Sequence, residues 1–512
     1  MMANHWIIVP VVLPAMLGAF LVLALRHDLW LQRVFGTAGM VALLAVALGN
    51  LAAASAGPPQ VYLLGDWPVP FGILLVLDRL SALMVALQAG LALAVTVYAV
   101  ATGWDSRGRH FHALMQFQMM GLSGAFLTGD AFNLFVFFEV LLIASYGLMI
   151  HGGGGARLKA GVQYVAFNLV GSTLFLIALA TLYSVLGSLA MADIALRAAA
   201  LPAGEGAMLR VAVVLLFLVF AVKGALLPLQ FWLPGTYAAA PGPVAALFAV
   251  MTKVGAYAVI RFHLTVFPET TAAIGPMVEP LLMPAALATL VLGALGVLGA
   301  RTLGRAVAFA ALASMGTLFT AVALGTPQAT AAAIYYTLHS TLAAAVLFLA
   351  VDLVRDRRGG DGLDLAAPPI AQGGLIAAIF LAGAIAMAGM PPLSGFLGKL
   401  MILDAARGPV QGWVWSVVLA TGFVTILGFA RAGSLVFWKA HQTAADPAPH
   451  PAEPWAFAAA GLLLAGLVAL TVLAGPAMDW IGATAEGLHA RSPYLDAVLN
   501  ARPVAQTLPP EG

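Results

Sequence analysis

The sequence predicts an all-α polytopic membrane protein, because apolar residues dominate it and recur in runs of membrane-spanning length. Hydrophobic residues make up 62% of the 512 residues and charged residues only 9%. Runs of about 20 apolar residues repeat along the chain, which is the length that crosses a hydrocarbon core of about 30 Å. Such runs begin near residues 7, 34, 79, 113, 132, 162, 209, 243, 280, 305, 328, 373, 411 and 455. We therefore expect about 14 transmembrane helices in one domain over residues 1–475.

The distribution of basic residues predicts how these helices are oriented. If the N-terminus lies outside, most of the 23 lysines and arginines fall on the cytoplasmic side, the bias that is typical of membrane proteins. The opposite side receives Arg197, Arg210, Arg407, Arg491 and Arg502. This pattern predicts an even number of spans with both termini outside, which in a bacterium is the periplasmic side of the inner membrane. Residues 476–512 would then form an extracytoplasmic tail along the membrane surface.

The composition excludes several kinds of chemistry. The chain has no cysteine, so it can form no disulfide, thiolate metal site or iron–sulfur cluster, and any redox centre must belong to a partner. A net charge of +2 with scattered basic residues gives no reason to expect a nucleic-acid partner. The glycines at residues 152–155 are not followed by the Lys-Ser/Thr pair of a phosphate-binding loop and are interpreted as a connector. We expect no cofactor, and the sequence does not define a metal site.

Three segments between the apolar runs differ from the rest in composition. Residues 55–77 contain a Gly-Pro-Pro turn and two short apolar stretches at residues 61–63 and 71–73, which predict an outer β-hairpin. Residues 187–208 are interpreted as a second outer loop with weak amphipathic character. Residues 351–369, rich in Arg and Asp, are interpreted as a solvated cytoplasmic connector.

Two of the predicted spans are interrupted by prolines. The seventh span carries Pro228 and Pro234, and the twelfth carries Pro391 and Pro392. Proline removes a backbone donor and clashes with the preceding turn, so carbonyl groups are left free inside the bilayer. A simple proline kink is the alternative for either helix alone. The two spans lie five apart and run in opposite directions, so spans 4–8 and 9–13, about residues 113–265 and 280–436, are predicted to be inverted repeats.

Buried charge is the main functional signal, since three of the five lysines, Lys223, Lys253 and Lys399, lie within long apolar stretches. A charge at the bilayer centre costs at least a few kcal/mol and is normally kept only where it faces the protein interior and handles an ion. Lys223 lies 13 residues after Arg210, about 20 Å along a helix, so its stem is too short to reach the surface. Glu139, an acid in the middle of a span, is its expected partner. A static ion pair between helices is the alternative.

Three further positions extend this set. Lys253 lies near the middle of the eighth span without an acid close to it in sequence, which favours a relay role. His339 in the eleventh span can pass protons between its two ring nitrogens, and a helix-to-helix hydrogen bond is the alternative. Lys399 follows the second break, although Asp404 and Arg407 come soon after it and its side chain could instead reach the surface. We interpret these residues as parts of one buried proton relay.

The motifs around the buried residues resemble those of the proton-translocating subunit family shared by respiratory complex I and the Mrp-type multisubunit cation/proton antiporters. The matching stretches are Lys223-Gly-Ala-Leu-Leu-Pro-Leu-Gln-Phe-Trp-Leu-Pro, Ala240-Pro-Gly-Pro-Val-Ala-Ala, Lys253-Val-Gly-Ala-Tyr and Gly389-Met-Pro-Pro-Leu-Ser-Gly-Phe-Leu-Gly-Lys. Within the family, residues 130–146 are most similar to the D-type member of the Mrp antiporters. The chain also lacks the long lateral helix of the largest complex I relative.

The resemblance implies a role for each buried residue. Glu139 and Lys223 would form a coupled pair, with Lys253 as the central relay lysine. His339 would be the relay in the eleventh span, and Lys399 would connect the path to its exit or to a neighbouring subunit.

The same resemblance implies a subunit of a secondary transporter, not an enzyme. We expect a proton-translocating subunit of a multisubunit monovalent cation (Na+)/proton antiporter, assembled with subunits of the Mrp A, B, C, E, F and G types. The alternative is a proton-pumping membrane subunit of a complex I-like NADH dehydrogenase or a membrane-bound hydrogenase. Gln230 departs from complex I members, which usually have a histidine there, and glutamine cannot titrate. The sequence shows no acidic cluster that would coordinate a sodium ion.

Overall fold

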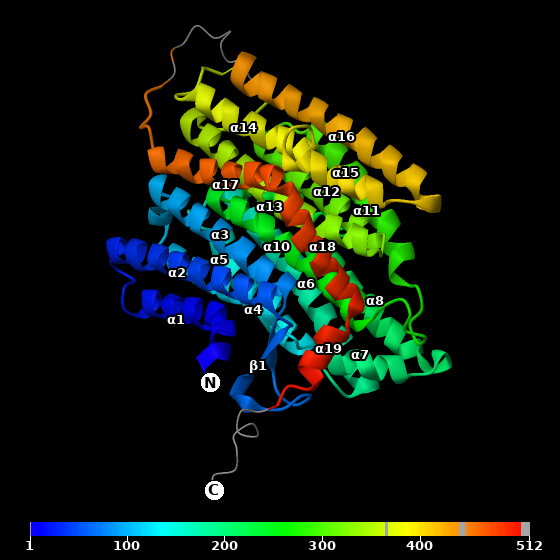
Figure 1. The fold of residues 1–512 in the computed structure, drawn as a ribbon. Helices are drawn as coiled ribbons and strands as arrows, with labels where there is room; N and C mark the ends of the chain where they lie inside the picture. Colours follow the sequence, from blue (N-terminus) through cyan, green and yellow to red (C-terminus); the bar gives the residue numbers. More distant parts are fainter. Residues whose placement is uncertain (1, 364–366, 440–445, 447, 503–512) are drawn as a thin grey trace.

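Long helices lying roughly side by side make up most of the protein in the computed structural model, which describes residues 2–363, 367–439, 446 and 448–502 (Figure 1). The α-helices are α1 (Val9–Leu23), α2 (Leu29–Ala56), α3 (Arg79–Ala101), α4 (Phe111–Leu127), α5 (Ala131–Met149), α6 (Gly155–Leu186), α7 (Met191–Ala200), α8 (Ala207–Lys223), α9 (Trp232–Ala239), α10 (Gly242–Ile260), α11 (Val278–Gly299), α12 (Leu303–Ala323), α13 (Pro327–Arg358), α14 (Gly373–Ala388), α15 (Ser394–Ala405), α16 (Gln411–Gly433), α17 (Pro454–Val472), α18 (Ala474–Ala490) and α19 (Ser492–Leu499). Short 3-10 turns lie at Met2–Ile7, Leu64–Asp66, Trp104–Arg107, Ala203–Glu205 and Gly408–Val410, and π-helical turns at Arg261–Val266 and Ser434–Trp438.

The described helices confirm the predicted membrane class. Ten of the helical segments in this part of the chain are long and apolar enough to cross a membrane, and the apolar helices α1 and α14 are shorter. The two spans that the sequence predicts to be interrupted are each divided in two, α8 from α9 and α14 from α15. The chain is therefore a multi-pass membrane protein with an all-helical fold.

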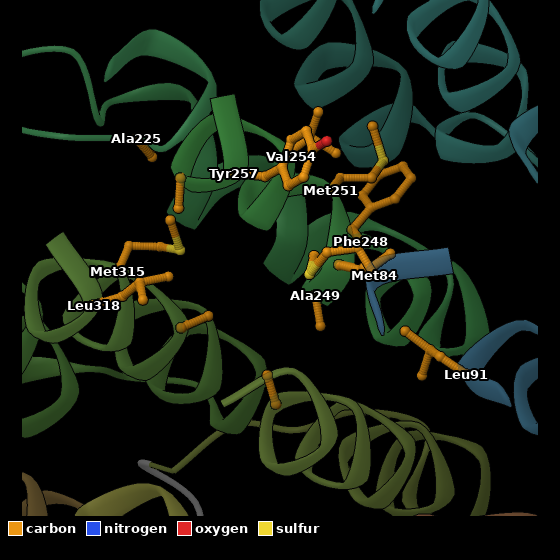
Figure 2. Close-up of a cluster of buried hydrophobic side chains, with 14 of the residues drawn as sticks. Met84, Leu91, Ala225, Phe248, Ala249, Met251, Val254, Tyr257, Met315 and Leu318 are labelled. Carbon is orange, nitrogen blue, oxygen red and sulfur yellow. The ribbon is translucent and has the colours of Figure 1, made fainter. Parts of the chain in front are cut away.

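The centre of the molecule is built around α10, in which every residue is buried. Its neighbours α12 and α13 are buried along nearly all of their length, whereas α2, α6, α16 and α17 keep one face exposed. Figure 2 shows the side chains at this centre, where residues from α10 lie between those of α3 and α12: Met84, Leu91, Phe248, Met251, Val254, Tyr257, Met315 and Leu318. A helix that is apolar all round belongs in a protein core, so the chemistry of α10 is shielded from lipid and water.

The predicted outer hairpin forms, with its second strand displaced from the expected position. Strand β1 (Gln60–Leu63) pairs antiparallel with β2 (Leu74–Leu77), with Gln60 opposite Leu77. Residues 71–73, expected to be in the second strand, precede it, because the amides of Phe71 and Gly72 bond to the carbonyl of Pro68 and close a turn. The four residues of β2 are all buried, so burial and not alternation defines this strand.

The interpretation of residues 351–369 as a solvated connector is wrong for its first half. Helix α13 continues to Arg358, and Asp352 is only 3% exposed. Its carboxylate accepts hydrogen bonds from the Tyr98 hydroxyl at 3.0 Å and the Trp104 indole at 2.8 Å. Polar partners on α3 and the following turn therefore let a charged stretch remain helical and buried. Residues 364–366 lie outside the described part of the chain.

The C-terminal segment packs against other helices of the fold. Helix α18 runs along α13, and the Trp480 indole donates to the Ser55 hydroxyl at 2.9 Å (Figure 1). Helix α19 contacts α7, the amphipathic helix that occupies the predicted second outer loop. The described part of the predicted tail is thus helical, and its residues 503–512 lie outside the described part of the chain.

Candidate functional site

Lys223 is the last residue of α8 and lies at the start of the first helix break. Its side chain is 9% exposed, and its Nζ donates to Oδ1 of Asn168 on α6 at 3.0 Å. The ring of Phe138 on α5 lies 5.6 Å from the same Nζ, close enough for a cation–π contact. The partners of this ammonium are therefore neutral groups.

Glu139 on α5 does not form the direct ion pair that the sequence suggested. Its carboxylate accepts a hydrogen bond from the hydroxyl of Ser172, and no ion pair joins it to Lys223 within the described residues. Asn168 and Ser172 lie four residues apart on α6, so one helix face presents both polar groups. Both charged residues and both polar residues line a cavity of about 10 Å³, roughly the space of one water molecule.

Lys253 lies on α10, next to the point where α10 crosses the end of α8. A Cβ added to Gly255 would lie 2.6 Å from the backbone nitrogen of Gly224, so this crossing requires glycine. Lys253 is 2% exposed, and its Nζ lies 3.1 Å from the sulfur of Met315 on α12. A thioether is a weak acceptor, and no carboxylate ion-pairs with this ammonium among the described residues. Its positive charge is therefore weakly compensated.

His339 and Lys399 meet at the second helix break. The Nδ1 atom of His339, a fully buried residue on α13, lies 3.0 Å from the hydroxyl of Ser394, the first residue of α15. The other ring nitrogen has no hydrogen-bond partner in the described part of the chain. Lys399 on α15 is half-buried, and its Nζ donates to the carbonyl oxygen of Ala388, the last residue of α14, at 2.7 Å. The break thus supplies an acceptor for the lysine.

The prolines contribute unequally to the two breaks. Pro228 lies between α8 and α9, and Pro391 and Pro392 lie between α14 and α15. Pro234 is different, because it is the third residue of α9, in the first turn, where its missing N–H has no intrahelical partner to lose. Gln230 lies in the first break, 6% exposed, with an unpartnered side-chain oxygen among the described residues.

The structure groups the predicted residues into two clusters with one lysine between them. Glu139 and Lys223 lie on one side, His339 and Lys399 on the other, and Lys253 lies on the central helix α10, which packs against both α8 and α13. Sequence reasoning missed the neutral partners Asn168, Ser172, Met315 and Ser394. The four-residue spacing of Asn168 and Ser172 within an apolar helix is the signal that could have revealed them.

One cluster of possible metal ligands lies away from these lysines. Ligand atoms of Asp356, His450 and Glu453 lie within 4.8 Å of one another. Arg357 already pairs with Glu453 at 3.1 Å, and His450 pairs with Asp356 at 2.8 Å. These contacts compensate the carboxylates, so the cluster offers little for a cation.

Comparison with known proteins shows the protein family to which this chain belongs. Residues 128–426 match the family model described as NADH:quinone oxidoreductase/Mrp antiporter, transmembrane. The chain belongs to this family of membrane subunits. Within the family it resembles the D-type antiporter subunits. It is 38% identical to the D-type subunit of a probable K(+)/H(+) antiporter of Rhizobium meliloti, over 97% of this chain and 98% of that protein.

Two further comparisons agree with this placement. The chain is 33% identical to the D-type subunit of an Na(+)/H(+) antiporter of Bacillus subtilis, over 97% of this chain and 99% of that protein. A chain in the structure of the Mrp complex from Dietzia sp. DQ12-45-1b superimposes with a TM-score of 0.88 at 27% identity, covering 98% of this chain and all of that one.

Proposed function

We propose that this chain is the proton-translocating D-type subunit of a multisubunit monovalent cation/proton antiporter. Protons would move along Glu139, Lys223, Lys253, His339 and Lys399. The observation that supports this most strongly is that Lys223 and Lys253, deep in the fold, bond only to neutral groups in the described residues. Buried ammonium groups without counter-ions are costly, and a protein that keeps them across its centre uses their ability to gain and lose protons.

The first step of the mechanism is a switch at the α5–α6–α8 cluster. With its carboxylate on Ser172, Glu139 stands away from Lys223, whose ammonium is held by Asn168. Rotation of Glu139 across the small cavity would bring the two charges together and stabilise the charged lysine. Rotation back would remove that stabilisation and release the proton toward α10.

The later steps depend on Lys253 and His339, whose hydrogen-bond partners are weak or incomplete. Lys253 faces a thioether, so it holds its charge only transiently. His339 has one bonded and one free ring nitrogen, so it can accept a proton on one side and release one on the other. Lys399 would receive the proton at the break. One elementary charge crossing 100 mV is worth about 2.3 kcal/mol, so modest changes in partner are enough to couple the path to the membrane potential.

The topology proposed from the sequence is consistent with this path. Counting α8–α9 and α14–α15 as one interrupted span each gives 14 spans with α1–α6, α10–α13, α16 and α17. Both termini would then be periplasmic in a bacterial inner membrane. The units α4–α10 and α11–α16 would be inverted repeats, each with a break and a lysine beside it.

Partners and the transported cation are part of the same proposal. A subunit of this kind would assemble with Mrp A, B, C, E, F and G type subunits. The relatives named above are antiporter subunits for sodium and for potassium, so the cation is proposed as a monovalent ion of either kind. Asp356, His450 and Glu453 are the one group of possible ligands found among the described residues, and their carboxylates are already paired.

A second function is favoured by the family description, which also names NADH:quinone oxidoreductase. In that setting the same residues would move protons, with energy from electron transfer in other subunits. Identifying the polypeptides that co-purify with the intact assembly separates the two, because small antiporter subunits and iron–sulfur subunits give distinct sets.

The test of the relay uses everted membrane vesicles that contain the whole assembly. Replacing Glu139 or Lys223 with alanine is expected to abolish cation-dependent proton efflux while the subunits still assemble. Lys159→Ala, which changes an exposed lysine on α6, is the matched control and is expected to keep full activity. Full activity in either relay variant would refute the proposed path.

A further inference from the structure

A polar stripe continues from the central lysine toward the outer end of α10. Lys253, Tyr257, Arg261 and Thr265 follow one another at intervals of four residues. This spacing places side chains along one face of a helix, and all four residues are buried. The last two lie in the π-helical turn Arg261–Val266, an irregularity that is frequent at functional sites.

Hydrogen bonds connect the middle of this stripe to an acidic residue. The guanidinium of Arg261 donates to both carboxylate oxygens of Asp78, at 2.6 and 2.9 Å, and to the hydroxyl of Tyr257 at 3.2 Å. Tyr257 donates in turn to the carbonyl oxygen of Phe126 at 2.5 Å. Arg261 is 2% exposed and Asp78 is 8% exposed, so the ion pair lies inside the protein.

A cavity lies at the outer end of the stripe. Its volume is about 180 Å³, and Asp78 and Thr265 both line it. The hydroxyl of Thr265 and the Nε of Arg261 are buried without a hydrogen-bond partner in the described residues. A cavity of this size has room for several water molecules, and Asp78 and Thr265 offer polar atoms on its otherwise mostly apolar wall. Water that filled this cavity from the outer side would lie close to the ion pair.

The C-terminal helices cover this cavity. The Arg491 guanidinium, between α18 and α19, donates to the carbonyl of Thr265 at 2.9 Å. The ring of Tyr494 lies over the Arg261 guanidinium at 4.9 Å, and residues of α18 including Ala483 line the cavity. A segment more than 200 residues away in sequence therefore forms one wall of the site.

We propose that this stripe is a proton outlet to the outer side that branches from Lys253, with the Asp78–Arg261 pair as its gate and α18–α19 as its lid. The proposal rests on the proposed proton translocation. A proton leaves the Lys253 ammonium for the Tyr257 oxygen as the Tyr257 hydroxyl turns from the carbonyl of Phe126 and gives its own proton to an Asp78 oxygen that Arg261 has released. Asp78 then passes it to water in the cavity, and Arg261 closes the pair again.

A purely structural role, in which the Asp78–Arg261 pair only holds helices together, explains fewer of these observations. A buried ion pair is often no more stabilising than apolar packing, so an anchor gives no reason to keep one here. Neither does an anchor require a cavity of about 180 Å³ beside the pair or a lysine on the same helix face.

The chain has no cysteine, so the outlet can be tested by labelling after assembly. Ala483→Cys introduces a thiol at an exposed position that lines the cavity, and a membrane-impermeant cationic thiol reagent is added from the outer side of right-side-out vesicles that contain the whole assembly. We expect proton-coupled antiport to fall at least about fivefold on labelling. Glu486→Cys on the same helix is exposed but does not line the cavity, and its labelling is expected to leave the rate unchanged.

Activity before labelling shows that each variant is folded, so a loss on labelling is not a folding defect. Complete labelling of Ala483→Cys with an unchanged rate would overturn the outlet. If Lys223→Ala still abolished antiport in that case, the relay would stand without this branch. If Lys223→Ala instead kept full activity, the proposed function itself would fail.

A second variant tests the hydrogen-bonded link. Tyr257→Phe keeps the ring in the core of Figure 2 but removes the hydroxyl between Arg261 and the carbonyl of Phe126. We expect the antiport rate to fall about tenfold, equal to ~1.4 kcal/mol of barrier, with the assembly intact. Tyr335→Phe, which removes a buried tyrosine hydroxyl bonded to Leu470, is the control. A normal rate in Tyr257→Phe would remove Tyr257 from the path.

Discussion

The two interrupted helices hold their lysines in different ways. At the α8–α9 break, Lys223 is the last helical residue and bonds to a side-chain amide, that of Asn168 on a neighbouring helix. At the α14–α15 break, Lys399 comes after the interruption and bonds to the main-chain carbonyl of Ala388. Both ammonium groups lie at the C-terminal end of a helix, which carries partial negative charge, but only Lys399 bonds to a main-chain carbonyl there. The ammonium of Lys223 is held by a side chain that can change rotamer. The ammonium of Lys399 is held by a backbone carbonyl, which has a fixed position.

This difference suggests that the lysines at the two breaks have different roles in proton transfer. A charge held by rotating groups is easily gained and lost, which suits a switch. A charge held by a main-chain carbonyl keeps the same partner, which suits a fixed terminus of the path. Four predictions test this comparison, from the largest expected effect to the smallest.

The strongest test replaces each lysine by glutamine, which can still donate a hydrogen bond but cannot carry a proton. We expect Lys223→Gln to lower the antiport rate by at least about 100-fold, or ~2.7 kcal/mol, and Lys399→Gln by about tenfold. Rates are measured as cation-dependent proton efflux from everted vesicles, with the exposed Lys159→Gln as the control. Equal losses at the two breaks would mean that their lysines do the same work.

The second test concerns the close packing beside each break. A Cβ on Gly395 would meet the carbonyl of Ala386, and one on Gly255 would meet the backbone of Gly224. We expect either change to alanine to destabilise the protein by about 1–3 kcal/mol, seen as a lower thermal midpoint of the purified assembly. Gly235→Ala in α9 meets no atom within 4 Å and should leave that midpoint unchanged. A normal midpoint in both variants would show that the breaks are loosely packed.

The third test removes the neutral partner at the first break. Asn168→Leu keeps the side-chain size but takes the acceptor from Lys223. We expect a rate loss of about fivefold, because an unpaired buried ammonium is disfavoured by ~1 kcal/mol or more. Thr173→Leu, on the exposed side of α6, is the matched control. If Asn168→Leu behaved like its control, Glu139 alone would govern the lysine.

The smallest expected effect is a pH dependence that arises from the cap of α5 in the first half. Asp130, just before α5, caps that helix by accepting the Asn133 amide at 2.7 Å, and burial raises the pKa of its carboxyl to about 6. The folded state then binds more protons than the unfolded state between pH ~4 and ~6, so stability falls as pH rises through this window. The matching cap of α12 is Thr302, which does not titrate.

Asp130→Asn keeps a capping oxygen and is expected to flatten the thermal midpoint between pH ~4 and ~6. Asp404→Asn, at an exposed position on α15, should keep the wild-type profile. A steep profile in Asp130→Asn would show that another group causes the dependence.

The membrane class and the main helices of this protein could be predicted from hydropathy and from the positions of prolines alone. Long apolar runs can be stable only as helices in lipid, so the membrane class, both interruptions and the burial of Lys223 and Lys253 follow from local sequence. The neutral partners could not be predicted, because Asn168 reaches Lys223 only through packing of helices 55 residues apart in sequence. The same reason hid the burial of Asp352, whose charge is compensated by donors from α3 and its following turn.

The sequence by itself determined that apolar helices build the fold, where two of them break and which residues carry charge inside them, since these depend on local transfer energies. The tertiary structure alone decided which group meets each charge. It placed Ser172 at Glu139, a thioether at Lys253 and a backbone carbonyl at Lys399. Such contacts depend on how helix surfaces interlock across the whole fold, and that information is distributed over the chain instead of residing in any one segment.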